Sequence, residues 1–170
     1  MVTWKEKIRG RELEACHVIV ASLLSGFSEI GVLNQGVVNN ITKKLASNLK
    51  AWFDATGRNP GIQQEDSSSV RIKKIFQIMN ETLNFAGEVS IQETPNDPAI
   101  LITSSKCRIC PIGVGEAEIP GTACPFPGLI TYLAKLYSPD KKGIKIIPHD
   151  FHILTKKEGA CHLYFGEDIQ

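Results

Sequence analysis

The sequence predicts an α+β fold in which N-terminal helices pack on an antiparallel sheet. Apolar residues recur at helical spacing through the first half of the chain, up to about residue 86. After Gly87 the spacing changes to the two-residue alternation of strands, and turn residues divide these strands into pairs. Because the strand pairs follow the helices instead of alternating with them, an antiparallel sheet is favoured over a Rossmann-type parallel one.

Length and charge narrow the class of protein. At 170 residues the chain fits one domain over residues 1–170, helical over about 1–86 and sheet-forming and metal-binding over about 87–170. The net charge of +1 gives no electrostatic reason to expect nucleic acid or an anionic membrane as a partner. No apolar run approaches the ~20 residues of a membrane span, and residues 1–10 are too polar for a secretory leader, so a cytoplasmic location is expected.

Three helices are predicted in the first half, over residues 11–26, 35–55 and 69–85. The second has the clearest apolar stripe, with residues every three or four positions: Val38, Ile41, Leu45, Leu49 and Trp52. The third has a comparable stripe: Ile72, Ile75, Phe76, Met79 and Leu83. A polar, turn-rich loop is expected between them.

The second half is predicted as two strand pairs with a short helix between them. Residues 89–91 and 100–102 form the first pair around a turn at 94–98. A Gly- and Pro-rich stretch over 107–128 leads into a helix over 128–137. The second pair comprises strands at 143–155 and 160–165, joined by a four-residue loop.

The cysteines are the most informative residues. Their number is odd and no export signal precedes them, so we expect reduced thiols rather than disulfides. Four of the five lie in the last 64 residues: Cys107, Cys110, Cys124 and Cys161. The first two form a CxxC turn that offers two thiolates to one metal ion, and the other two would complete a closed tetrahedral zinc site with Zn–S distances of about 2.3 Å.

Several alternatives for this site stay open. Cys124 and Cys161 are also plausible as core residues, since cysteine is among the most buried residue types. A histidine or carboxylate near the last strand could replace one thiolate: His149, Asp150, His152 or His162. The four-residue loop would set Cys161 opposite Leu154, on one face with His152 and Asp150. Four thiolates could also hold an iron–sulfur cluster, whereas a thioredoxin-type role is disfavoured by the residues after Cys110, which start a helix poorly.

Cys16 belongs to a different environment. It lies on an apolar helical segment, so we expect a buried packing residue. The adjacent His17 is a poor partner for a nucleophile, because neighbouring helix positions point about 100° apart. Other candidates are weaker: Gly113 and Gly115 lack the context of a dinucleotide loop, and Glu116 and Glu118 are typical of a solvated loop.

Two segments, residues 124–133 (CPFPGLITYL) and 157–165 (KEGACHLYF), resemble the 4-vinyl reductase domain family. The likeness is to its small archaeal members, described as hydrocarbon-binding, whose fold is shared with subunits of the TRAPP tethering complex. Cys124 and Cys161 match two of the family's cysteines. Asp150 and Ile153 fall where the family has Glu and Cys, so one ligand is missing there and the CxxC pair is the compensating donor.

The resemblance implies a structural metal and a small apolar or aromatic ligand held between helices and sheet, close to the metal loop. It also implies pairing of two chains as a homodimer, often through N-terminal helices. The word "reductase" implies no activity here, because no nicotinamide or flavin motif is present. The sequence thus predicts a non-enzymatic, zinc-stabilised domain that binds or senses a hydrophobic molecule; the alternatives are a metal-dependent or iron–sulfur redox enzyme and a protein-interaction scaffold.

Overall fold

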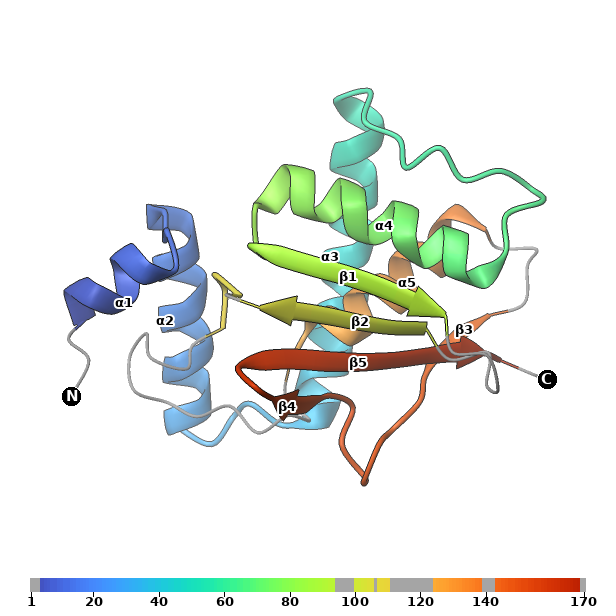
Figure 1. The fold of residues 1–170 in the computed structure, drawn as a ribbon. Coiled ribbons are helices and arrows are strands. Elements are labelled where there is room, and N and C mark those ends of the chain that lie inside the picture. The colour runs from blue at the N-terminus through green and yellow to red at the C-terminus, as the bar shows by residue number, and fades with distance from the viewer. Residues whose placement is uncertain (1–3, 94–99, 106, 111–123, 139–142, 169–170) are drawn as a thin grey trace.

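The computed structural model of the chain describes residues 4–93, 100–105, 107–110, 124–138 and 143–168. Within these ranges the fold is α+β, as the sequence predicts: helices pack against an antiparallel sheet (Figure 1). The helices are α1 (Trp4–Gly10), α2 (Ala15–Glu29), α3 (Gln35–Ala55), α4 (Ser68–Leu83) and α5 (Phe126–Tyr137). The strands are β1 (Glu88–Glu93), β2 (Ile100–Ser105), β3 (Ile144–Ile146), β4 (Thr155–Lys157) and β5 (Ala160–Glu167).

The strand β5 organises the sheet. On one side it pairs antiparallel with β2, which in turn pairs with β1 at the edge. On its other side β3 pairs with the C-terminal end of β5 and β4 pairs with its N-terminal end. Because side chains alternate along a strand, Cys161, Leu163 and Phe165 share one face of the sheet, and Leu163 and Phe165 are buried there.

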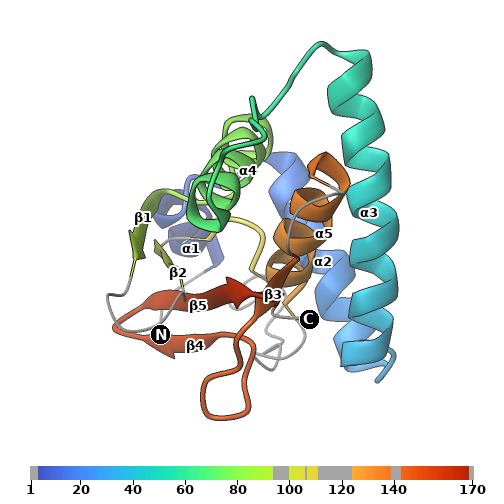
Figure 2. The same cartoon turned by 90° about the vertical axis from the view of Figure 1, so that its right-hand side faces the viewer.

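Helix α5 lies between the sheet and α3 (Figure 2). It is apolar through most of its length, and it buries Leu129, Ile130 and Leu133 in a core that also takes residues from α3, α4 and β5. At Gly128 the two helices approach closely, because a Cβ atom there would lie 3.0 Å from the Thr42 hydroxyl of α3. One continuous core therefore joins the helical half of the chain to the sheet.

Local sequence explains where the helices begin and end. The side chains of Asn34 and Ser67 accept hydrogen bonds from the N–H groups of Val37 and Val70, which cap α3 and α4. Proline within its first turn helps start α5. Asn84 ends α4 in the left-handed region (φ 46°), so the chain turns sharply toward β1.

The helix predictions are largely confirmed, with one omission and one shift. The bounds of α3 are as predicted, and α4 and α5 begin within two residues of the predicted positions. The helix predicted over 11–26 spans Ala15–Glu29 instead, and the polar segment Trp4–Gly10 forms α1, which we did not predict.

Burial on α3 differs from the predicted stripe. The buried residues are Val38, Thr42, Ala46 and Phe53, whereas Ile41, Leu45 and Trp52 are exposed. The contact with α5 at Gly128 explains the difference, because a close approach of two helices requires small side chains at the crossing.

The predicted strand over 143–155 is wrong in its middle. Only β3 and β4 are strands, and between them residues 149–152 form a tight turn closed by two backbone hydrogen bonds between His149 and His152. The loop between β4 and β5 has two residues, Glu158 and Gly159, both at positive φ, instead of the predicted four. The turn predicted at 94–98 lies outside the described residues.

Among the described residues, no helix combines the length and apolar character that crossing a membrane requires.

Candidate metal centre

The CxxC turn is fixed from inside by its two middle residues. Ile109 is buried against the main core, and the Arg108 side chain is buried beside it. The backbone N–H groups of Ile109 and Cys110 donate hydrogen bonds to the Cys107 sulfur. Such N–H···S bonds stabilise the thiolate, which is the form that binds a metal.

The segment between α1 and α2 holds the same turn from outside. The Arg11 guanidinium donates to the carbonyl oxygen of Cys110 at 2.8 Å, and both its Nε, at 3.1 Å, and its Nη2 donate to the carbonyl oxygen of Cys107. A planar guanidinium that bonds both carbonyls fixes the backbone on either side of the turn. Arg11 therefore restrains the direction in which both thiols leave the turn.

Arg108 locks the turn to two further segments. Its guanidinium donates to the backbone carbonyls of Arg11 and Asn84, each at 3.1 Å, and to the Asn84 side chain at 2.9 Å. It also pairs with Glu12 at 2.7 Å. The backbone N–H of Arg108 donates to the carbonyl of Phe85 at 2.7 Å. The turn is thus tied to the N-terminal segment and to the corner after α4.

The other two predicted ligands come from separate elements and reach the same region. Cys124 lies two residues before the start of α5, and its sulfur accepts a hydrogen bond from the N–H of Phe126. Cys161 lies on β5, on the face that packs against the helices. Both side chains contact the main core cluster.

Neighbouring cysteines contribute to the pKa shifts of three of the four thiols: Cys107, Cys124 and Cys161. Burial raises the pKa of Cys107 to about 11, and charge on Cys110 and Cys161 adds to the rise. Burial also raises the pKa of Cys124, and charge on Cys107, Cys161 and Cys110 raises it further. The pKa of Cys161 is raised by burial and by Cys110, and lowered by the nearby Lys156 and Arg11. Each of the four sulfurs therefore lies within electrostatic reach of others in the group.

This donor set fits a soft divalent metal, although the sulfurs are not drawn together around a common centre. Tetrahedral Zn–S bonds of about 2.3 Å put neighbouring sulfurs about 3.8 Å apart. In the described part of the chain, a group of three potential ligand atoms all within 4.8 Å of one another is found at Glu14, Cys16 and His17, not at the four cysteines. Binding of zinc would therefore require the thiols to move closer together.

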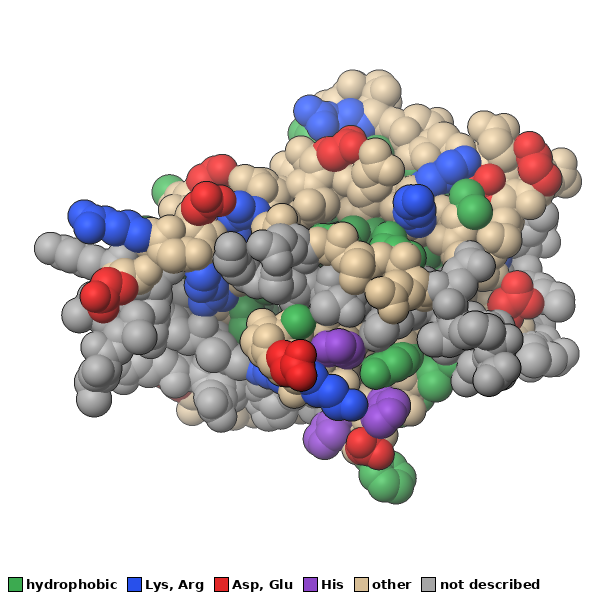
Figure 3. All heavy atoms as spheres, viewed as in Figure 1, with side chains coloured by type: hydrophobic (Ala, Val, Ile, Leu, Met, Phe, Trp, Pro, Cys, Tyr) green, Lys and Arg blue, Asp and Glu red, His purple; other side chains and the backbone are tan. Residues whose placement is uncertain are grey.

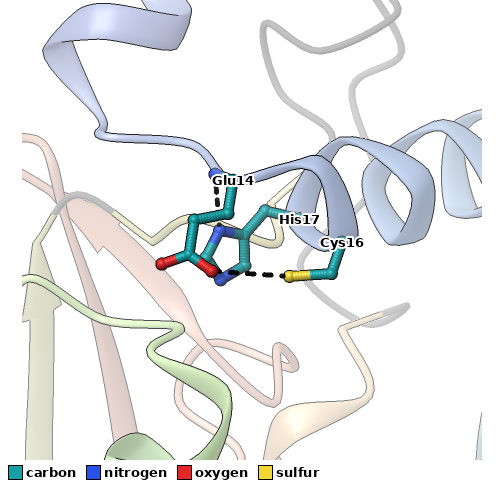
Figure 4. Close-up of side chains that lie close together, drawn as sticks. All are labelled: Glu14, Cys16 and His17. Atoms are coloured by element: carbon teal, nitrogen blue, oxygen red, sulfur yellow. Dashed lines mark hydrogen bonds between the residues drawn. The ribbon is translucent and has the colours of Figure 1, made fainter.

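The cluster of Glu14, Cys16 and His17 has a structural explanation (Figure 4). Nδ1 of His17 accepts a hydrogen bond from the Glu14 backbone N–H, which caps α2, and Nε2 lies 3.0 Å from the Leu83 carbonyl oxygen, to which it donates. Both ring nitrogens are therefore occupied, so the buried imidazole has no lone pair for a metal. Cys16 itself is exposed, so the prediction that it is buried in the core is wrong.

The histidines near the last strand lie on the other face of the sheet. His162 follows Cys161 directly, so strand alternation turns it away from the cysteine face. His149 stacks on Tyr164, which is on the His162 face, with ring centroids 5.1 Å apart. Histidine side chains accordingly gather on the outer surface beside β4 and β5 (Figure 3). This geometry favours Cys161 over His162 and His149 as a ligand.

The predicted relation of Cys161 to His152 and Asp150 is also wrong. In the structure Cys161 is paired with Lys156, since the two-residue turn shifts the register by two positions. Asp150 and His152 belong to the tight turn at 149–152, where both side chains are exposed and the Asp150 carboxylate contacts Nδ1 of His149. The candidates Gly113, Gly115, Glu116 and Glu118 lie outside the described residues.

A groove that we did not predict from individual residues runs between α4 and β1. It encloses about 770 Å³, and its residues lie on one face of α4 and on one side of the edge strand: Lys73, Phe76, Gln77, Asn80, Glu81, Asn84, Val89 and Ile91. Phe76, Val89 and Ile91 supply apolar surface, and Lys73, Gln77 and Glu81 are exposed. Asn84, at one end of the groove, is the residue that Arg108 of the CxxC turn binds.

Contacts between aromatic rings connect this groove to the cysteine group. The Phe76 ring meets Phe85 edge-on with centroids 5.1 Å apart, and Phe85 stacks on Phe126 at 4.3 Å. Phe126 is the residue whose N–H binds the Cys124 sulfur. Groove and cysteines are therefore parts of one packed region.

Comparison with known proteins assigns the chain to a family. The model of the MJ0207 family matches residues 31–166. The chain belongs to the MJ0207 family. Uncharacterized protein MJ0207 of Methanocaldococcus jannaschii is 26% identical over 125 residues, which cover 73% of this chain and 77% of that protein. Uncharacterized protein MJ1342 of the same organism is 39% identical over 67 residues, 39% of this chain and 57% of the relative's length. The MJ0207 match spans all four candidate ligands and begins after α2.

Proposed function

We propose that this MJ0207-family protein binds or senses a small hydrophobic or aromatic molecule, without catalysis, on a scaffold stabilised by one structural zinc ion. The proposed ligands of the zinc are Cys107, Cys110, Cys124 and Cys161. The approach of these thiols from three segments of the chain, the CxxC turn, the start of α5 and β5, to within electrostatic reach of one another is the observation that carries the proposal. The resemblance to the 4-vinyl reductase domain family is part of the same proposal.

The surroundings of the thiols support a structural role for the metal. Backbone N–H groups bind the sulfurs of Cys107 and Cys124, and Arg11 and Lys156 supply positive charge near Cys161. Four thiolates on one Zn²⁺ leave a net charge of −2, which these donors and cations offset. A four-thiolate sphere also leaves no open position for substrate, which separates it from a catalytic zinc site.

The groove between α4 and β1 is the proposed binding site. Its volume of about 770 Å³ is within the range of small-molecule sites, and its apolar floor with a polar rim is typical of them. Occupancy of the groove would press on Phe76, and the contacts through Phe85 and Phe126 lead from there to Cys124. This packing supports a sensing role, since a ligand and the metal-stabilised segment share the same aromatic contacts.

The free state of all five cysteines supports a reducing, cytoplasmic environment as part of the proposal.

Metal analysis of the purified protein tests the zinc site. One zinc per chain and a colourless solution are expected, with loss of the metal when Cys107, Cys110, Cys124 or Cys161 is changed to Ser. Cys16→Ser is the matched control, because it removes a thiol that lies outside the group and should leave the zinc content unchanged. Iron with visible absorbance, or full zinc content in the Cys124→Ser and Cys161→Ser variants, would contradict the proposal.

Binding of the apolar dye 8-anilinonaphthalene-1-sulfonate tests the groove. Val89 lines the groove and Val70 lies on α4 outside it, and the two are exposed to nearly the same extent. Val89→Asp should abolish dye binding and Val70→Asp should leave it intact, both with native circular dichroism. Equal binding by the two variants would place the site elsewhere.

A further inference from the structure

Two histidines close the tight turn that lies between β3 and β4. The backbone N–H of His149 donates to the carbonyl oxygen of His152 at 2.9 Å, and the reverse bond is 3.0 Å long. The two residues between them, Asp150 and Phe151, have φ of 51° and 65°, which is the conformation of a type I′ turn. Residues 149–152 therefore form a two-residue hairpin in which the histidines are directly opposite each other.

This pairing places both histidine side chains on one face of the hairpin. The Cβ atoms of directly opposed residues are about 4.5–5.5 Å apart. Two imidazole nitrogens that bind one metal ion at about 2.0–2.1 Å lie about 3 Å from each other, a separation that rings on neighbouring Cβ atoms can reach. The turn thus offers two nitrogen donors to one ion.

The His149 ring is already oriented by its neighbours. It stacks on Tyr164 of β5 with ring centroids 5.1 Å apart, and its Nδ1 lies 3.1 Å from the Asp150 carboxylate. When Nδ1–H donates to that carboxylate, the lone pair of the neutral ring is left on Nε2. A carboxylate on the other ring nitrogen is the usual arrangement of metal-binding histidines, because it fixes the tautomer and raises the basicity of the ligand.

The backbone of the turn is unusual for its sequence. Type I′ turns favour Asn, Asp or Gly at both central positions, and a bulky residue such as Phe151 rarely adopts positive φ. The Phe151 side chain is 98% exposed, so its burial does not offset the cost of this conformation. Strained residues of this kind cluster at ligand-binding sites. Here the strained conformation is the one that sets the two histidines opposite each other.

We infer that His149 and His152 form a second metal site, for a divalent transition-metal ion that prefers imidazole ligands, such as Ni²⁺, Cu²⁺ or Zn²⁺. Figure 3 shows histidine side chains gathered on this surface beside an acidic side chain. Because His149 stacks on Tyr164, the site lies on the opposite face of the sheet from Cys161. The inference therefore does not rest on the zinc proposed at the cysteines.

The ion itself would complete the site. In the described part of the chain, the two histidines and Asp150 do not form a group of three ligand atoms all within 4.8 Å of one another. The His152 side chain is exposed, so its ring has room to approach His149. Water would fill the remaining positions around the ion, which makes this an exchanging site, in contrast to a closed structural one. The third histidine of this surface, His162, is paired with Thr155 of β4, outside the turn, and is not among the proposed ligands.

Calorimetric titration with Ni²⁺ tests the site. The protein is first dialysed against metal-free buffer, so that only tightly held metal remains. Cys16→Ser serves as the background, because the exposed Cys16 thiol is itself a ligand for Ni²⁺. One Ni²⁺ should bind per chain, and His152→Gln should weaken this binding by about tenfold or more. The matched control, His162→Gln, should bind Ni²⁺ nearly as tightly as the background, and all three chains should share one circular dichroism spectrum.

Asp150→Asn tests the orienting carboxylate. Asn also tolerates positive φ, so the turn should be kept while the charge beside Nδ1 of His149 is lost. The affinity for Ni²⁺ should fall by about tenfold. Glu158→Gln is the matched control: it removes an exposed carboxylate at the same φ of 51° from the neighbouring β4–β5 turn, and should leave the affinity unchanged. Equal affinities of the two variants would overturn the role of Asp150.

Paramagnetic broadening of the histidine ring signals in nuclear magnetic resonance locates the ion. Substoichiometric Ni²⁺ should broaden the signals of His149 and His152 and leave those of His17 sharp, since both nitrogens of the His17 ring are hydrogen-bonded. Broadening of His17 before the other two would place the ion beside Glu14 and overturn the inference.

Three calorimetric results would also overturn it: no Ni²⁺ binding in the background chain, unchanged binding in His152→Gln, or an equal loss of binding in His162→Gln. Release of zinc in step with Ni²⁺ uptake would show that the added ion enters the cysteine group, and would overturn the inference as well. A protein without zinc that still binds Ni²⁺ through His152 would contradict the cysteine site alone.

Discussion

Arg108 is predicted to be the residue on which the position of the CxxC turn depends most. The Arg108→Met variant keeps most of the buried aliphatic volume but removes every guanidinium bond. The backbone carbonyls of Arg11 and Asn84 then lose a charged donor, and the Glu12 carboxylate loses its ion-pair partner. The substitution therefore isolates the contribution of the guanidinium from that of packing.

The expected loss of stability follows from these bonds. A hydrogen bond to a charged group contributes about 1.5 kcal/mol or more, so the two carbonyl bonds account for about 3 kcal/mol. The Glu12 pair adds at most about 1 kcal/mol, because its carboxylate is largely exposed (79%) and screened by solvent. For a chain of this length about 3 kcal/mol corresponds to a fall in melting temperature of about 6–12 °C.

Thermal unfolding followed by circular dichroism measures this effect. Arg58→Met is the matched control, since Arg58 is exposed and makes one long hydrogen bond, 3.4 Å to Thr82, and a ring contact with Trp52. Its expected loss is about 1 kcal/mol or less. Hydrogen exchange of residues 11–17 should accelerate in Arg108→Met only. If both variants melted within about 2 °C of the wild type, the interpretation of Arg108 as the lock of the turn would be refuted.

Three further predictions concern the contact between α3 and α5, the zinc site, and the hydrogen bonds from Arg11 to the CxxC turn. Gly128→Val should destabilise the protein by about 2 kcal/mol in denaturant unfolding, because its Cβ would lie 3.0 Å from the Thr42 hydroxyl. Adding Thr42→Ala to the same chain should restore part of the lost stability. An unchanged midpoint of denaturant unfolding in Gly128→Val would contradict the close approach of the two helices. Zinc binding at neutral pH should release about three protons or more, because raised pKa values keep the thiols of Cys107, Cys124 and Cys161 protonated without metal. Zinc affinity should therefore rise steeply with pH. A pH-indicator titration measures the released protons, and zinc binding without proton release would contradict this prediction. Removal of zinc with a chelator should accelerate hydrogen exchange in residues 11–17, which Arg11 ties to the turn. Unchanged protection in these residues would show that the Arg11 hydrogen bonds do not depend on the metal.

Helical periodicity predicted the parts of the fold where one face of an element is buried. The α4 stripe through Ile72, Ile75 and Met79 is buried as expected, because the apolar and polar sides of that helix are distinct. Helix α2 lacks this contrast, so its sequence did not reveal that the small residues face inward and the large ones outward. On α3, the small residues at the crossing with α5 took the place predicted for Ile41 and Leu45.

The candidate site, like the fold, was predictable from the sequence only where the residues are close together in the chain. The CxxC spacing predicts Cys107 and Cys110 as a ligand pair from local sequence alone, since both thiols come from one turn, and their binding of a metal stays a prediction. The neighbour of Cys161 on β4 depended on the β4–β5 register, which a two-residue turn shifted from the predicted Leu154 to Lys156. The hydrogen bonds between Arg11 and the CxxC turn, and between Arg108 and the Arg11 carbonyl, join residues almost a hundred positions apart. The groove forms only where α4 and β1 lie side by side. No local sequence pattern could therefore predict either feature.

X-ray absorption at the zinc edge of the purified protein tests the central proposal most directly. We expect one zinc per chain with four sulfur neighbours at about 2.3 Å. A wild-type spectrum with nitrogen or oxygen in the first sphere, or a protein that takes up no zinc, would contradict the four-cysteine site.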